Sequence, residues 1–395
     1  MSTDTTALDF APSEDPFVVA HGGFYRRWLS MIDDIDELRA TVGRLRGTTE
    51  DLWVPVWEEV GRRHERAGDD RERAGDHAAA RRAHLQAKTY YAIGRFPGEI
   101  TPVKRAISDD CARAYRKACA HLDPPLEVVE VPHQGQVIRC HFRAPHGAAA
   151  DRPVPALLIM CGADVFKEDR GWAAEFALDN GLAALVMDGP GTGENPFPWA
   201  PESVSAWVAA LGWLEARPEV DARRIGAFGI SRGGYSVLQL AGTVPDRVQA
   251  VVASAGHPFG YRMTDGELDA FVEARNRRAM WRYGEPGGPP SFPPTSREQE
   301  LADFERWALS ELGLVDRITQ PVLMINGKRD HLAPIGNIYF MLESGPATGR
   351  RARVYPDAGH CAFRYFTDWA PASFRWLASE LAGAGGAEDP RRPAS

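Results

Sequence analysis

Three residues far apart in the sequence, Ser231, Asp330 and His360, are of the types that nucleophilic catalysis requires. A serine hydroxyl is a poor nucleophile at neutral pH, so a neutral imidazole must take its proton during attack. A carboxylate then fixes the imidazole tautomer and stabilises the imidazolium that forms. These types predict a proton-relaying triad in which Ser231 attacks a carbonyl carbon, His360 is the base and Asp330 orients it.

The sequence around each residue predicts an element that would position it. Ser231 lies in Gly229-Ile-Ser-Arg-Gly233, between a strand-like and a helix-like run, which is typical of a sharp turn that exposes a nucleophile. Asp330 follows the apolar run 321–327, and His360 lies on a glycine-bearing loop after the run 353–355. All three are therefore expected beyond the carboxyl ends of parallel strands, where such sheets bind ligands. The rival residues Asp316, Asp357, His257 and His331 do not hold equivalent positions.

The chemistry also needs an oxyanion hole, because a negative oxygen forms when the serine attacks. One donor is expected to be the backbone N–H of Arg232, the residue after the nucleophile, and the other should come from a loop after an earlier strand. The apolar run 156–160 predicts that strand, and residues 161–164 follow it. We expect the second donor at Ala163, with Gly162 as the alternative.

Strand-like and helix-like runs alternate over most of the chain, which predicts a mostly parallel, doubly wound α/β sheet with helices on both faces. Residues 126–131 and 137–142 predict an antiparallel hairpin at its edge. The remaining strands are predicted at 156–160, 182–187, 225–230, 248–253, 322–325 and 353–355.

The pattern divides the chain into four parts. Residues 1–20 and 383–395 are predicted to be disordered, 21–123 a helical amino-terminal cap domain, and 124–382 the sheet domain. An insertion at about 256–314 is long enough to be a functional lid. Aromatic residues of the helical region and the lid are candidate pocket walls: Trp28, Tyr90, Tyr91, Phe259, Tyr261 and Trp281.

Composition narrows the function classes further. A net charge of −8 argues against a general nucleic-acid binder, and no stretch approaches the roughly 18 apolar residues of a membrane span. The acidic start lacks an apolar signal core, and five cysteines are an odd number, which predicts reduced thiols in the cytoplasm. Because no His, Cys or Asp cluster has ligand spacing along the sequence, neither a metal nor another cofactor is expected.

With the triad in the order Ser231, Asp330, His360, the chain resembles the α/β-hydrolase superfamily. The run Asp188-Gly-Pro-Gly-Thr-Gly-Glu194, after a helical amino-terminal region, resembles one branch of it. That branch contains 2,6-dihydroxypseudooxynicotine hydrolase, fungal polyketide-shortening hydrolases and FrsA-like esterases. The resemblance covers about residues 21–380.

The resemblance implies hydrolysis of an ester, a thioester or the carbon–carbon bond of an activated ketone, in a medium-sized aromatic or polyketide-like substrate. It also implies a homodimer and allows a carrier-bound acyl substrate. Carbon–carbon cleaving members carry an extra acidic residue, and Glu267 and Glu273 lie in the corresponding region without matching spacing. Glu267, Asp164 and Tyr261 are candidate auxiliary acids or substrate contacts. The alternatives are an acyltransferase or cyclase with the same acyl-enzyme, and a non-catalytic binding protein on the same scaffold.

Overall fold

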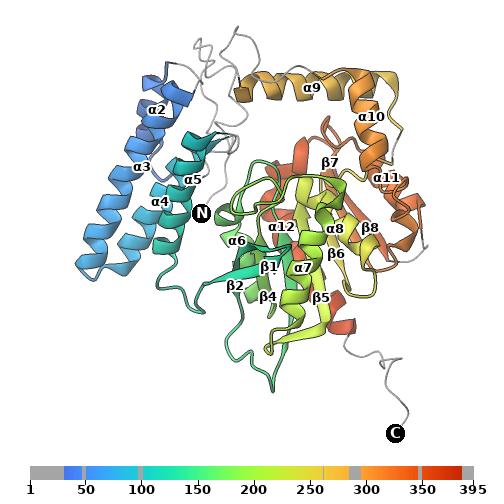
Figure 1. Ribbon diagram of the computed structural model, residues 1–395, viewed down its shortest axis with the longest axis horizontal. Coiled ribbons are helices and arrows are strands. Elements are labelled where there is room, and N and C mark those ends of the chain that lie inside the picture. Colours follow the sequence, from blue (N-terminus) through green and yellow to red (C-terminus); the bar gives the residue numbers. More distant parts are fainter. Residues whose placement is uncertain are drawn as a thin grey trace. The chain divides into compact units, whose positions relative to one another are not determined.

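The computed structural model describes residues 31–46, 50–96, 101–260, 262–283, 295–345 and 349–384 (Figure 1). The predicted disordered segment 1–20 lies outside these residues, as do Trp28 and Tyr261. The predicted carboxyl-terminal tail begins at residue 383, but helix α12 (Phe366–Ala384) continues through 384, and the rest of the tail lies outside the described residues.

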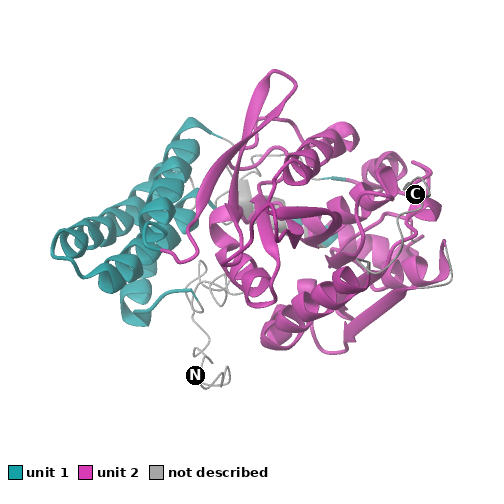
Figure 2. Cartoon of the chain, turned by 90° about the horizontal axis from the view of Figure 1, so that it is seen from below, with its two compact units in different colours: residues 1–121, 273–295 teal, residues 122–272, 296–395 magenta. Residues whose placement is uncertain are grey.

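The chain forms two compact units, which Figure 2 shows in different colours. The first comprises residues 1–121 and 273–295, and the second comprises 122–272 and 296–395. The boundary falls inside helix α9 (Asp265–Tyr283). The segment 256–314, which the sequence predicts as a single lid, therefore contributes residues to both units.

The first unit is helical: α2 (Ile35–Arg44), α3 (Glu50–Arg73), α4 (His77–Arg95) and α5 (Pro102–Ala118). Each of three helices begins after a residue that accepts a backbone N–H of the first turn, namely Asp34, Asp76 and Thr101. Such side chains satisfy donors that have no partner within the helix.

Large aromatic side chains fill the core of this unit. Trp57, Tyr90 and Tyr91 are fully buried among apolar residues of α3, α4 and α5. The hydroxyls of Tyr90 and Tyr91 donate hydrogen bonds to Glu37 and Glu65. The two tyrosines are therefore core residues, because their rings are buried and their hydroxyls are hydrogen-bonded within this unit. The prediction that they are pocket walls was wrong.

The second unit is built on one eight-stranded sheet in the order β1-β2-β4-β3-β5-β6-β7-β8. The predicted hairpin, β1 and β2, is antiparallel and joins β4, and the strands from β4 to β8 are mutually parallel. The strands are β1 (Glu127–His133), β2 (Gln136–Arg143), β3 (Val154–Met160), β4 (Ala183–Met187), β5 (Val220–Ile230), β6 (Val251–Ser254), β7 (Val322–Gly327) and β8 (Arg350–Tyr355).

Helices cover both faces of this sheet, and strand periodicity decides which side chains meet them. In β3, Ala156, Leu158 and Met160 join the core under α7 and α8, whereas Leu157 and Ile159 join the core under α6 and α12. The remaining elements are α6 (Gly171–Asp179), α7 (Val204–Glu215), α8 (Arg232–Thr243), α10 (Arg297–Trp307), α11 (Gly336–Glu343) and short 3₁₀ segments at 167–169, 201–203, 315–317 and 360–365.

Three strands begin three or more residues from their predicted starts, and one of them is β8, which begins at Arg350, three residues early. β5 begins at Val220, five residues early, because the largely charged run Asp221-Ala-Arg-Arg224 continues the extended chain, which the apolar pattern alone does not reveal. β6 begins at Val251, although Val248 and Ala250 before it are buried, since burial does not require ladder pairing. Within the described ranges, no helix combines the length and apolar character needed to cross a bilayer.

Candidate active site

Ser231 occupies a strained turn between the end of β5 and the start of α8. Its φ of 59° and ψ of −119° lie outside the regions that L-residues commonly adopt. A Cβ on Gly229 would lie 2.1 Å from the carbonyl oxygen of Gly233, and one on Gly233 would lie 2.4 Å from that of Met160. Only glycine fits at these two positions, so the pentapeptide can make the turn that exposes the serine.

Asp330 lies on the loop that follows β7, and four donors hold its carboxylate. Oδ1 accepts the backbone N–H groups of Leu332 (2.8 Å) and Ala333 (3.1 Å). Oδ2 accepts Asn326 Nδ2 (2.8 Å) and lies 2.7 Å from His360 Nδ1. Each oxygen therefore has two partners, which fixes the plane of the carboxylate.

His360 connects the other two residues. Its Nδ1 faces Asp330, and its Nε2 lies 2.9 Å from Ser231 Oγ. The side chains of Ser231, Asp330 and His360, which the sequence predicts to form a triad, thus lie together in the structure, with Ser231 and Asp330 both within hydrogen-bonding distance of His360. Asn326 ties their loops, because its Oδ1 accepts the backbone N–H of Cys361, the residue after His360, at 3.1 Å.

The pKa values of Asp330 and His360 are shifted in opposite directions. Burial would raise the pKa of Asp330, but the charge and hydrogen bond of His360, together with Asn326 and the Ala333 N–H, lower it. Burial would lower the pKa of His360, but the neighbouring Cys361 and the Asp330 carboxylate raise it well above 6.5. The pair therefore favours an ionised carboxylate beside an imidazole of increased basicity.

The predicted oxyanion loop lies against the nucleophile. A Cβ on Gly162 would be 3.3 Å from the Ile230 carbonyl oxygen and 3.6 Å from Ser231 Cβ. Arg232 is the first residue of α8, so its backbone N–H belongs to the first turn, whose N–H groups lack partners in the helix. Both predicted sources of oxyanion donors are therefore next to Ser231.

A buried ion cluster forms around Lys167, just after this loop in the sequence. Lys167 Nζ contacts Glu168 Oε1 (2.8 Å), Asp188 Oδ2 (2.9 Å) and Glu194 Oε2 (2.8 Å). Lys167, Glu168 and Asp188 are at most 3% exposed. Burial raises the pKa of Asp188 despite the ammonium, and the neighbouring Glu168 adds to the increase.

Asp188 joins two loops at the carboxyl edge of the sheet. Its Oδ1 accepts the backbone N–H of Lys167 (2.7 Å), and its Oδ2 accepts that of Glu194 (3.0 Å). Gly193 has φ +54°, and a Cβ there would lie 2.2 Å from Asp188 Oδ2. The run from Asp188 to Glu194 is thus a tight turn folded around its own buried carboxylate.

Aromatic rings pack against the first turn of α8, which follows the nucleophile. The guanidinium of Arg232 is 4.7 Å from the ring centroid of Trp199, which stacks on Trp307 at 4.8 Å. Tyr235 packs edge-on against both tryptophans and donates its hydroxyl to the Trp307 carbonyl. Phe259, a predicted pocket wall, packs on Tyr235.

The remaining predicted site residues have no contact with the triad among those described above. Glu267 accepts the backbone N–H and the hydroxyl of Thr264 at the start of α9, which is a capping arrangement. Asp164 is the last residue of the predicted oxyanion loop and is partly exposed, whereas Tyr261 and the side chain of Trp281 lie outside what the structure describes. Glu273 is an exposed residue of α9.

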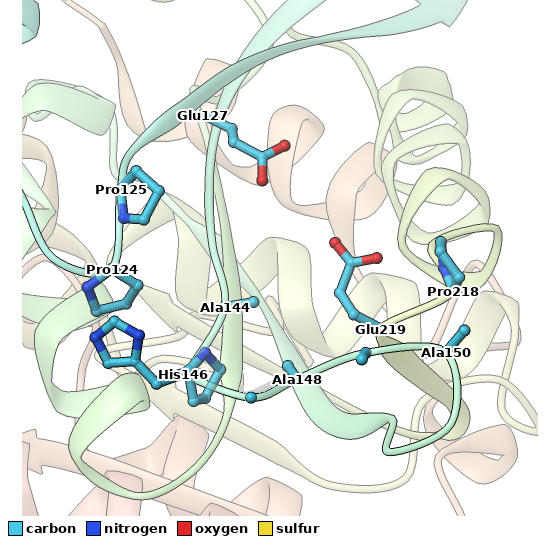
Figure 3. A pocket seen from close by; sticks show the side chains of 12 residues that line it. Pro124, Pro125, Glu127, Ala144, His146, Ala148, Ala150, Pro218 and Glu219 are labelled. Carbon is cyan, nitrogen blue, oxygen red and sulfur yellow. The ribbon is translucent and has the colours of Figure 1, made fainter.

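A pocket of about 340 Å³ lies at the opposite edge of the sheet (Figure 3). It is lined by residues around Pro124, His146 and Glu219, just before β5 begins. Because Ser231 follows the other end of that 11-residue strand, the two places are separated by roughly 35 Å along it. This pocket is therefore not part of the candidate active site.

Sequence reasoning missed Asn326, Lys167 and the Trp199–Trp307 pair. Asn326 had a signal, because a polar residue near the end of an apolar strand must find buried partners. Lys167 had none, since it lies in the charged run Lys-Glu-Asp-Arg that reads as solvated surface. The tryptophans are more than 100 residues apart, and only the fold brings them together.

Comparisons with known proteins agree with this architecture. Residues 33–280 match the family model described as esterase FrsA-like. A 2,6-dihydropseudooxynicotine hydrolase of Paenarthrobacter nicotinovorans is 28% identical over 254 residues, covering 62% of this chain and 62% of that protein. A 20-hydroxy-prefusarin hydrolase of Gibberella moniliformis is 26% identical over 265 residues, covering 63% and 60%. The chain thus spans about three fifths of the length of these curated relatives.

The crystal structure of the 2,6-dihydroxy-pseudo-oxynicotine hydrolase has the same fold. It superposes with a TM-score of 0.73 at 21% identity, over 91% of this chain and 96% of that one. The predicted α/β-hydrolase fold with a helical amino-terminal region is confirmed. Since the family model matches more than half of the chain, this protein belongs to the FrsA-like esterase family.

Proposed function

We propose that this protein is a serine hydrolase in which Ser231, His360 and Asp330 form the catalytic triad. The observation that carries the proposal is the continuous contact from Asp330 Oδ2 through both nitrogens of His360 to Ser231 Oγ, at 2.7 and 2.9 Å. This geometry is within the reach that proton transfer to a general base needs. The family membership supports the same chemistry.

In the first half-reaction Ser231 Oγ bonds to the substrate carbonyl carbon while its proton passes to Nε2 of His360. The Nδ1–H of His360 donates to Asp330, which keeps Nε2 free to accept that proton. The tetrahedral intermediate collapses when the bond to the leaving group breaks, and His360 returns the proton to that group. The product of this half is an acyl-enzyme on Ser231.

In the second half-reaction a water molecule attacks the acyl carbon and gives its proton to His360. The carboxylic acid then leaves as the proton returns to Ser231 Oγ, which restores the enzyme. The backbone N–H groups of Arg232 and of Ala163 or Gly162 hold the oxyanion in both halves. Losing one such donor typically costs about 10²–10³ in rate.

We propose that the substrate is a medium-sized aromatic or polyketide-like carbonyl compound. Trp199 and Arg232 support this, because the half-buried Trp199 ring packs against the guanidinium of the residue that follows the nucleophile. The relatives named for 2,6-dihydropseudooxynicotine and 20-hydroxy-prefusarin also act on organic molecules of this size class. An ester, a thioester, including a carrier-bound one, or an activated ketone would meet the triad in the same way.

The position of Glu267 favours ester or thioester cleavage over carbon–carbon cleavage. The extra carboxylate that the carbon–carbon cleaving relatives are expected to use has no counterpart here in Glu267, whose oxygen caps α9 through Thr264. An acyltransferase or cyclase would share every step up to the acyl-enzyme and differ only in the group that replaces water.

The test is a panel of matched ester, thioester and 1,3-diketone substrates with the same aromatic acyl group. The masses of the products identify the bond that breaks, and hydrolysis adds one water whereas cyclisation adds none. We expect turnover of the ester or thioester with one added water. Absence of turnover on every member of the panel by folded protein would contradict the proposal and favour a non-catalytic binding role.

We also propose, from the family resemblance, that the protein is a cytoplasmic homodimer. Light scattering on the purified chain would give twice the 43.4 kDa mass of one chain. A mass of one chain at micromolar concentration would contradict the dimer.

A further inference from the structure

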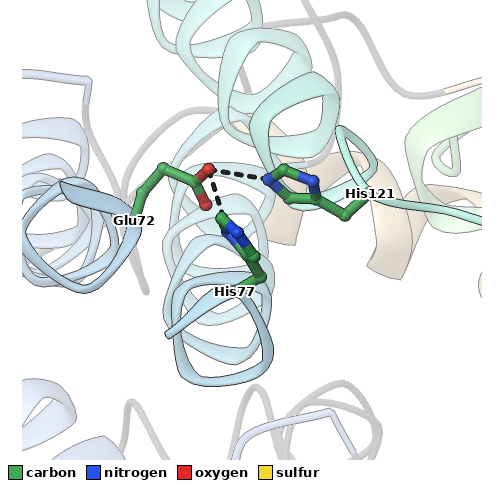
Figure 4. Close-up of side chains that lie close together, drawn as sticks. All are labelled: Glu72, His77 and His121. Carbon is green, nitrogen blue, oxygen red and sulfur yellow. Dashed lines mark hydrogen bonds and ion pairs between the residues drawn. The ribbon is translucent and has the colours of Figure 1, made fainter. Parts of the chain in front are cut away.

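Three metal-ligating side chains come together in the helical unit. They lie on the turn between α3 and α4 and on the segment that follows α5. Glu72 lies in the last turn of α3, His77 is the first residue of α4, and His121 follows the end of α5. Figure 4 shows the three side chains pointing toward one another from these separate segments. In the sequence, the charged stretch around Glu72 is typical of a solvated surface. It gives no sign of a metal site, because His121 is 49 residues away.

The ligand atoms converge closely. Glu72 Oε1 lies 2.7 Å from His121 Nε2 and 3.1 Å from His77 Nδ1, and one ligand atom from each residue lies within 4.8 Å of the others. The two imidazole rings are 3.9 Å apart between centroids. In a tetrahedral site with bonds of about 2.0–2.2 Å, ligand atoms are roughly 3.3 Å apart, so small side-chain shifts would let all three reach one ion.

We propose that Glu72, His77 and His121 bind a divalent transition-metal ion of the zinc class. Two imidazoles and one carboxylate suit zinc and its neighbours, whereas calcium and magnesium prefer sites made of oxygen ligands. Three protein ligands leave a fourth position for water. The side chains are 39–50% exposed, so an ion can enter without local unfolding.

The bound ion would link three helix ends that are held here by weaker contacts. One carboxylate oxygen, Glu72 Oε1, now contacts both histidines, and exposed ion pairs of this kind stabilise a fold only weakly. A metal at the meeting point replaces these two contacts with three coordinate bonds. The site is separate from the triad in the sequence and requires none of the residues 231, 330 and 360.

The experiment uses the full chain without a histidine tag, stripped of metal with a chelator and titrated with Co²⁺. A tetrahedral or five-coordinate site gives a visible d–d absorption that saturates at one equivalent, and Zn²⁺ then displaces the cobalt. Glu72→Gln, His77→Ala and His121→Ala should each weaken binding by at least about tenfold, since each removes a ligand atom.

The matched control is His146→Ala. His146 is also an exposed histidine paired with one carboxylate, Asp123, at 2.9 Å, but it has no second histidine in that pair. This variant should bind cobalt like the unaltered protein. Glu72→Gln keeps a hydrogen-bonding side chain, and circular dichroism checks that each variant is folded. A titration without saturable absorption, or unchanged affinity in the Glu72 and His121 variants, would overturn the site.

Discussion

Asp330 and Asp188 are both buried carboxylates on loops at the carboxyl edge of the same sheet, yet their environments shift the carboxyl pKa in opposite directions. Asp330 follows β7, and its pKa is lowered. Asp188 follows β4, and its pKa is raised. Burial alone raises the pKa of both, so the difference comes from what surrounds each carboxylate.

The surroundings differ in whether a neighbour can exchange a proton. Asp330 faces neutral donors and one imidazole, which can gain a proton during a reaction cycle. Asp188 shares one lysine with Glu168 and Glu194, and a lysine ammonium keeps its protons at neutral pH. The comparison indicates that the first carboxylate serves chemistry and that the second fixes the loop next to it.

The largest effect is expected when the nucleophile itself is removed. Ser231→Ala should reduce kcat by a factor on the order of 10⁶, as loss of a triad member does in other serine hydrolases. The fold should persist, because the substitution removes only an oxygen. Steady-state turnover on the best substrate of the panel measures the effect, with circular dichroism as the control. Full activity in a folded variant would contradict the role of Ser231.

The next effect sharpens the contrast at Asp330. Asp330→Asn keeps the shape of the side chain but favours the wrong imidazole tautomer, so kcat should fall about 10⁴-fold. The same change at Asp188, Asp188→Asn, alters a carboxylate whose hydrogen bonds go to Lys167 and to the backbone of Glu194, and it should reduce kcat far less. If the two variants lose activity equally, the distinction between the two carboxylates fails.

Lys167→Met tests the structural side of the contrast. It leaves three carboxylates around an empty position, and breaking a buried pair in this way typically costs about 3–5 kcal/mol of unfolding free energy. Lys117→Met is the matched control, since Lys117 also faces carboxylates, Glu65 and Asp69, but its side chain is 35% exposed.

The control variant should lose no more than about 1 kcal/mol. Urea unfolding of both variants provides the measurement. Equal losses would show that burial of the Lys167 cluster contributes nothing beyond an ordinary ion pair.

The smallest effect is a shift in pH dependence. Only neutral His360 can accept a proton, so kcat/KM should fall as the pH drops through its pKa. Because that pKa is raised, the midpoint of the fall should lie above 6.5. Residual activity of Asp330→Asn should show a lower midpoint, since one of the two neighbours that raise the pKa of His360 is gone. A midpoint at or below 6.5 in the unaltered protein would contradict the assigned electrostatics.

The sequence was sufficient for features whose signals are local. The strand–turn–helix pattern around Ser231 follows from its two glycines, and the buried strands β3, β4 and β7 follow from apolar runs with breaks at both ends. The mostly parallel sheet with its antiparallel hairpin follows from the alternation of elements, and the family follows from the run at Asp188.

Features that depend on distant partners could not be predicted. Lys167 is buried because Asp188 and Glu194 come from a loop that begins 21 residues later, and a lysine in a charged run otherwise reads as surface. Tyr90 and Tyr91 occupy a core because Glu37 and Glu65 satisfy their hydroxyls. The same limit applies to His77 and His121, which meet only after three helices pack.

The most direct test of the central claim is covalent labelling of the folded protein with a fluorophosphonate. Ser231 Oγ should displace fluoride from phosphorus, and mass spectrometry of peptides should find one phosphonylated residue, Ser231. Labelling should disappear in Ser231→Ala and become much slower in His360→Ala, because the base that activates the hydroxyl is missing. An unlabelled folded protein, or an adduct on a different serine, would contradict the account.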